Sequence, residues 1–178
     1  MPCASLHYAS RLNLGVRPQT KMTATARKVL GDLEAAHQLL ELESDAQRFR
    51  ITWVAAMALC RSVGHVLDKV DARTSPRLSA AINKAWASWH ADREQHKLFH
   101  EFIESERNAV LKEYEVGFMS GHAAFVVIPG MIMTTLPDEL FCPLAAGPYE
   151  GEDCRDVLAM AIGWWQLQLR EIEHAAAA

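Results

Sequence analysis

The sequence contains no run of apolar residues long enough to cross a lipid bilayer. Its longest apolar runs, such as Ala123–Ile128, are far shorter than the roughly 20 residues of a membrane-spanning helix. The N-terminal segment also lacks the lysine-flanked apolar core of a secretory signal. We therefore expect a cytoplasmic protein with no membrane partner, in which residues 1–21 form a disordered leader.

Paired cysteines and the common catalytic loops are missing as well. None of the four cysteines belongs to a C-x-x-C pair, so a zinc site built from them is not expected. Cys60 falls in a helical apolar pattern, where a free thiol acts as a small hydrophobic side chain. There is no G-x-S-x-G, P-loop or G-x-G-x-x-G pattern. We therefore predict no cofactor and no metal centre.

An excess of positive charge is also absent. The chain of 178 residues has a formal net charge of −4, and half of its residues are apolar. These values exclude a generally basic protein that coats nucleic acid, although they allow a local basic site. The length suits one domain with a sizeable hydrophobic core.

What the sequence does contain is helical periodicity over most of its length. Apolar residues recur every three or four positions over 23–43, with Val29, Leu33 and Leu40 among them. Ser44 and Gln47 have the spacing of a capping box, which predicts a second helix from about residue 45 to 70. Ser75 before Pro76 predicts the start of the next helical stretch, which continues to about residue 117 with a break between 89 and 96.

Glycine and proline cluster between residues 117 and 150, before a last helix at about 154–173. Two β-prone runs within 123–135, separated by Pro129 and Gly130, predict a short hairpin-like or irregular insertion. The fold class that we predict is mainly α, an up-and-down bundle of four or five helices. Residues 22–174 would form the single bundle domain, followed by a frayed tail at 175–178.

The most unusual stretch is FHEFIESERNAVLKEYE, residues 99–115, where charged residues enter an apolar helical arc. Arg107 falls inside the arc and His100 lies at its edge. Burying an arginine without a partner costs several kcal/mol, so Arg107 needs either an anion or a carboxylate beside it. Glu104 lies one helical turn from both His100 and Arg107, which makes a local ion-pair network available.

The residues RNAVLKEY, 107–114, resemble the signature of HEPN-fold proteins, R-x4-H-x-Y in its extended form. Arg107, Asn108 and Tyr114 match the pattern in type and spacing, whereas Lys112 stands where the family has histidine. The resemblance implies a helical-bundle protein that binds or cleaves RNA without metal, in a toxin–antitoxin or defence setting. It also implies a homodimer with a composite site, and a cognate antitoxin or nucleotidyltransferase as partner.

On this resemblance, Arg107, Lys112 and Tyr114 would be the catalytic residues. Arg107, Asn108 and Lys112 would bind RNA phosphate, with His100 and Glu104 in support. Arginine suits phosphate because its planar fork forms two parallel hydrogen bonds. Lysine has a reference pKa of about 10.4, far above that of histidine, so Lys112 puts proton transfer in doubt but not phosphate binding.

Three other interpretations stay open. The network of Arg107 and Glu104 can be purely structural, within a non-catalytic module for helical interaction or oligomerisation. His96 and His100 have the i, i+4 spacing of two metal ligands on one helical face. Two Glu-x-x-His units, 34–37 and 171–174, have the spacing found in di-iron bundles. The five tryptophans fall at apolar helical positions and are expected to serve as core or interface anchors.

Overall fold

The computed structural model describes residues 22–105, 124–126, 134–136 and 142–178. Its α-helices are α1 (Ala24–Leu42), α2 (Ala46–Lys69), α3 (Pro76–Ala91) and α5 (Cys154–Ala177). Two short turns complete the helical part, the 3-10 turn η1 (Asp71–Thr74) and the π-helical turn η2 (Phe99–Ile103). The predicted mainly α-helical bundle is therefore confirmed.

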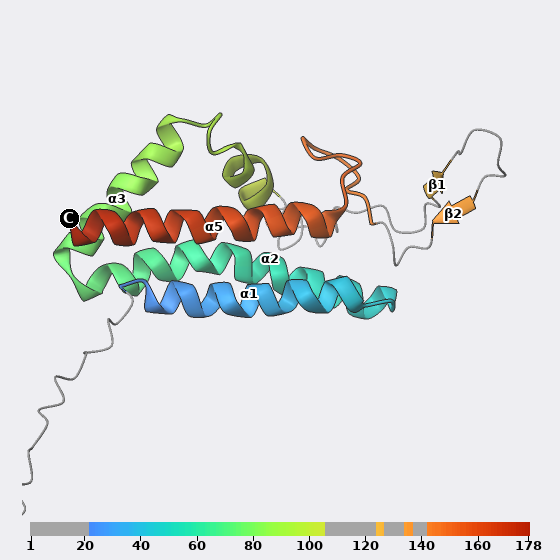
Figure 1. Cartoon of the computed structure of the whole chain (residues 1–178), viewed down its shortest axis with the longest axis horizontal. Helices are drawn as coiled ribbons and strands as arrows, with labels where there is room; N and C mark the ends of the chain where they lie inside the picture. Colours follow the sequence, from blue (N-terminus) through green and yellow to red (C-terminus); the bar gives the residue numbers. More distant parts are fainter. Residues whose placement is uncertain (1–21, 106–123, 127–133, 137–141) are drawn as a thin grey trace, which may run out of the picture.

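Helices α1, α2 and α5 lie side by side and form what we call the three-helix core (Figure 1). Side-chain pairs fix α5 antiparallel to α1: Arg27 pairs with Glu173 near one end, and Glu34 accepts a hydrogen bond from Gln166 further along. Gly64 of α2 makes the approach to α5 close, because a Cβ there would lie 2.8 Å from the Trp165 ring.

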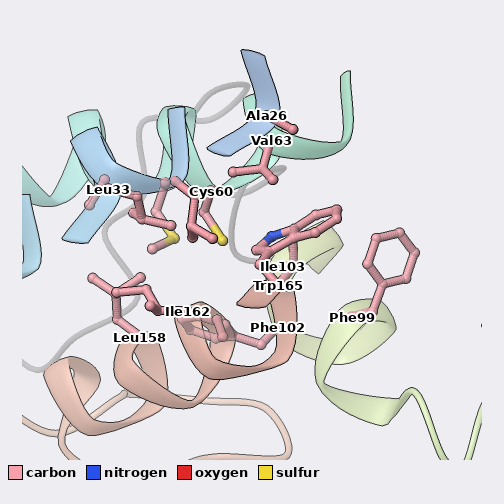
Figure 2. Packing of buried hydrophobic residues seen from close by; sticks show 14 of the residues in the cluster. Ala26, Leu33, Cys60, Val63, Phe99, Phe102, Ile103, Leu158, Ile162 and Trp165 are labelled. Carbon is pink, nitrogen blue, oxygen red and sulfur yellow. The ribbon is translucent and has the colours of Figure 1, made fainter. Parts of the chain in front are cut away.

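Helix α3, the connection 92–98 and η2 form a second region, which we call the aromatic arm. Figure 1 shows α3 rising away from the three-helix core and η2 returning to the side of α5. The buried apolar side chains of the three-helix core belong to one hydrophobic cluster. The arm contributes the buried side chains of Trp89, Phe99, Phe102 and Ile103 to the same cluster. Side chains from η2 and from the three-helix core converge in this cluster, with Trp165 between them (Figure 2).

Most predicted helix ends agree with the structure, and Ser75 caps α3 as expected by accepting a hydrogen bond from the Leu78 N–H. The predicted cap of α2 is wrong by one residue. Asp45 is the N-cap, with its carboxylate accepting from the Arg48 N–H at 2.8 Å. A carboxylate also interacts favourably with the positive end of the helix dipole, an advantage that the Ser44 hydroxyl lacks.

The frayed tail predicted from residue 175 is also wrong, because α5 continues to Ala177. Alanine has the highest helix propensity, and Ala176 is buried against the core. Before α5, strands β1 (Ala124–Val126) and β2 (Thr134–Leu136) pair antiparallel, with Phe125 opposite Thr135. None of the described helices combines the length and the apolar character needed to cross a membrane.

Candidate functional site

The motif residues predicted from the sequence, Arg107, Asn108, Lys112 and Tyr114, lie outside the described residues. The description reaches Ser105, two residues before Arg107, so it includes the chain that leads into the motif. The two supporting residues, His100 and Glu104, are both described. The structural evidence on the predicted site therefore comes from His100 and Glu104.

The chain enters the motif through the π-helical turn η2. The Glu104 N–H donates to the Phe99 carbonyl, five residues earlier, which widens the turn relative to an α-helix. As a result Phe99, His100, Phe102 and Ile103 are all buried, whereas a regular helix would place His100 at the edge of the apolar arc. Single π turns of this kind are frequent at functional sites. Here the turn holds residues 99–103 against the core.

His100 is enclosed, with only 2% of its side chain exposed. Its Nε2 lies 3.0 Å from the Trp89 carbonyl oxygen, and its Nδ1 lies 3.3 Å from Glu104 Oε2. Each ring nitrogen therefore already has a partner within the protein, and neither is left to take a proton from a substrate. His100 thus supports the turn and does not act as the proton carrier that the HEPN pattern would place at position 112.

The other histidine of the H-x-x-x-H pair, His96, is also used internally. Its Nδ1 accepts a hydrogen bond from the Trp164 indole N–H at 3.3 Å, and the residue is buried. His37 of the first Glu-x-x-His unit lies 3.0 Å from the Arg155 carbonyl oxygen. Among the described residues no group of three or more histidine, cysteine, aspartate or glutamate side chains is placed to hold a metal ion.

A groove of about 430 Å³ lies between α3 and α5, beside His96. Trp89 and Trp164 line it, and Trp89 donates its indole N–H to Gln168 at 2.5 Å. Lys84 and Glu171 line it too, so the charges along the groove have opposite signs. Three of the five tryptophans, Trp53, Trp89 and Trp165, are almost fully buried, in agreement with the predicted anchoring role.

Sequence reasoning missed a buried ion pair at the start of α5. Arg155 Nε and Nη2 contact the two oxygens of Asp153 at 2.9 and 2.7 Å, in a bidentate arrangement. Burial alone would raise the pKa of Asp153, but the hydrogen bonds from Arg155 and from the Cys142 backbone outweigh it and lower the pKa. An aspartate two residues before an arginine at a helix start is a signal that the sequence did offer.

No disulfide bond joins the described cysteines, and Cys60 and Cys154 are buried. Burial raises the pKa of Cys60 to about 12, so this thiol stays protonated and packs as the sequence predicted. Cys142 and Cys154 flank the isolated β-bridge between Pro143 and Asp153, and the Cys154 N–H donates to the Cys142 carbonyl at 2.9 Å. Burial also raises the pKa of Cys154, so its thiol has little nucleophilic character.

Comparison with protein-family models, with curated proteins and with solved structures gives no match to this chain. The HEPN resemblance of residues 107–114 therefore stays a prediction from the sequence.

Proposed function

We propose that this chain is a HEPN-like helical-bundle protein that binds RNA through the segment beginning at Arg107. Arg107 would contact a phosphate, Asn108 would orient it, and Lys112 and Tyr114 would line the same site. The observation that carries the proposal is the anchoring of η2, since Phe99, Phe102 and Ile103 are buried in the core just before the motif. When the chain before a binding residue is already ordered, less conformational entropy is lost as that residue binds its ligand.

Binding without cleavage is the form of this function that the chemistry favours. Phosphodiester cleavage without metal requires a group that exchanges protons near neutral pH. Lys112 occupies the place of that group, and His100 already has a partner at each ring nitrogen. If the protein were an enzyme after all, it would be a metal-independent ribonuclease with a different proton carrier.

The proposed assembly is a homodimer in the cytoplasm. On a regular helix, positions 107 and 112 are about 140° apart, so side chains from two protomers would have to meet to form one phosphate site. A cognate antitoxin or nucleotidyltransferase partner belongs to the same proposal, because the family resemblance implies it. A reducing compartment agrees with the absence of disulfide bonds among the described cysteines.

The proposal is tested by incubating the purified protein with total RNA, with and without a metal chelator. We expect retention of intact RNA by the wild type and loss of retention in Arg107→Ala. Arg50→Ala is the matched control, because Arg50 is exposed on α2 and is far from the motif in sequence. RNA bound equally by wild type and Arg107→Ala would refute the assignment, and so would an absence of binding.

A second candidate function is a non-catalytic module for helical interaction. The observation that favours it is the contact of Glu104 Oε2 with His100, which ties Glu104 into the protein interior. In that case Arg107 would complete a structural network with Glu104. Arg107→Ala would then lower the free energy of unfolding by about 1–3 kcal/mol, and it would have no effect on RNA.

A further inference from the structure

A second pocket, of about 300 Å³, lies between the C-terminal half of α2 and the middle of α3. Helix α2 contributes Arg61, His65 and Lys69, which are spaced four residues apart and therefore share one face. Helix α3 contributes Asn83 and Trp86. The volume is at the lower end of the range for small-ligand pockets. None of these residues belongs to the motif segment.

The charge of Arg61 is not neutralised by any carboxylate among the described residues. In the part of the chain that the structure describes, Arg61 and His65 form no ion pair with a carboxylate. The acidic residue that lines the pocket, Asp68, is engaged by Lys69 at 2.6 Å. Arg61 is half-buried, so an anion placed against it is partly shielded from water and binds more strongly than at an exposed arginine.

The wall opposite Arg61 is an aromatic ring held in place by other rings. Trp86 contacts Trp89, His90 and Phe99 in edge-on arrangements, with ring centroids 5.5, 5.2 and 5.6 Å apart. The residue is only half-buried, which leaves part of the indole free to stack. Asn83 lies one turn earlier on α3 and offers an amide with two donors and one acceptor.

We propose that this pocket binds a nucleoside monophosphate unit. The phosphate would lie against Arg61 and His65, the base would stack on Trp86, and the Asn83 amide would hydrogen-bond the edge of the base. Such a unit comes either from a free mononucleotide or from the 5′-phosphorylated end of an RNA. The proposal uses no residue of the motif segment, so it stands or falls independently of the proposed function.

The test is calorimetric titration of the full chain with AMP, GMP, CMP and UMP at millimolar concentration. We expect saturable binding of at least one nucleotide, and at least roughly tenfold weaker binding of the matching nucleoside and of ribose 5-phosphate. Arg61→Ala should weaken nucleotide binding by roughly tenfold or more. Arg50→Ala is the control of equal charge on the same helix and should bind as the wild type does.

Trp86 also packs against its neighbours, so a substitution there could disturb the fold as well as the site. A second substitution that keeps an aromatic ring therefore serves as the comparison. Trp86→Leu should weaken binding by roughly tenfold, whereas Trp86→Phe should stay within about threefold of the wild type. Urea midpoints measured on both variants show whether they are folded. Loss of binding in a folded Trp86→Leu supports the stacking role, and unchanged binding there contradicts it.

A six-nucleotide RNA with a 5′-phosphate, and the same RNA with a 5′-hydroxyl, distinguish the two sources. Tighter binding of the phosphorylated RNA than of free nucleotides identifies an RNA end, and the reverse order identifies a free nucleotide. Arg107→Ala should bind the mononucleotide as the wild type does. The proposal is overturned if no nucleotide and no phosphorylated RNA binds, or if Arg61→Ala binds as tightly as the wild type.

Discussion

The three-helix core and the aromatic arm are held together by different forces. In the core, aliphatic and small side chains of α1, α2 and α5 interdigitate, and the ion pairs of Arg27 with Glu173 and Arg155 with Asp153 fix the ends. In the arm, ring contacts dominate: Trp89 alone contacts Phe99, Trp164 and Trp165 with centroids between 5.0 and 5.8 Å.

This difference explains where polar groups carry structure and where they remain for function. In the arm, ring nitrogens are used within the protein: His100 joins η2 to α3, Trp89 joins α3 to α5, and His96 joins the connection 92–98 to α5. At one border of the arm lies the α2–α3 pocket with Arg61, and at the other the described part of the chain ends at Ser105, two residues before Arg107.

The largest effect is expected from breaking the buried ion pair of the core. Arg155→Met leaves the Asp153 carboxylate buried without its guanidinium, and we expect a loss of about 3–5 kcal/mol in the free energy of unfolding. Arg48→Met is the control, because 69% of the Arg48 side chain is exposed and its ion pairs should contribute within about 1 kcal/mol. Urea denaturation followed by circular dichroism measures both, and equal losses would contradict the assigned difference.

In the arm, the hydrogen bond of Trp89 with Gln168 is the sharpest target. Trp89→Phe keeps a ring in place but leaves the buried Gln168 amide without its donor, so we expect a loss of about 1–3 kcal/mol. Trp86→Phe is the comparison, since Trp86 is half-buried and its contacts are between rings. If Trp86→Phe were the more destabilising of the two in urea titrations, the hydrogen bond would not be the stabilising element.

Two glycines of the core helices should respond to alanine with opposite signs. At Gly64 a Cβ would meet the Trp165 ring at 2.8 Å, and the overpacking should exceed the gain in helix propensity and destabilise by roughly 1–2 kcal/mol. At Gly31 no atom lies within 4 Å, so alanine should stabilise by up to about 1 kcal/mol. Thermal unfolding midpoints measure both signs, and stabilisation by Gly64→Ala would show that α2 and α5 pack less closely than described.

The smallest effect on stability is expected from lowering the pH. Hydrogen bonds from Arg27 and Thr23 lower the pKa of Glu173, so the unfolded chain takes up its proton at a higher pH than the folded one. The stabilisation is complete above the ordinary glutamate pKa and is lost as the pH falls towards the lowered folded value. Urea midpoints between about pH 7 and pH 3 should fall less steeply for Glu173→Gln than for wild type. Parallel curves would exclude Glu173 as a contributor.

Much of the core follows from helical periodicity, because Leu33 and Leu40, which the spacing selected, are buried in α1, although Val29 is only half-buried. The arm follows in part. The break predicted between residues 89 and 96 agrees with the end of α3 at Ala91. The π turn at 99–103 was not predicted, because it rotates His100 into the interior and depends on ring packing against α5 that spacing does not reveal.

The two candidate sites also differ in how far the sequence predicts them. His100 and Glu104 were identified from their i, i+4 spacing and do contact each other. The α2–α3 pocket was missed because Arg61 and Trp86 are 25 positions apart and meet only through the angle between two helices. The spacing of Arg61, His65 and Lys69 on one helical face was the signal available for it.

The central claim is that the guanidinium of Arg107 grips RNA phosphate, and fluorescence anisotropy of a labelled single-stranded RNA tests it most directly. Arg107→Lys keeps the charge but loses the bidentate fork, so we expect roughly tenfold weaker binding than wild type, with Arg107→Ala weaker still. His100→Gln should change the free energy of unfolding more than the RNA affinity, because His100 is enclosed. Equal RNA affinity of wild type, Arg107→Lys and Arg107→Ala would contradict the account.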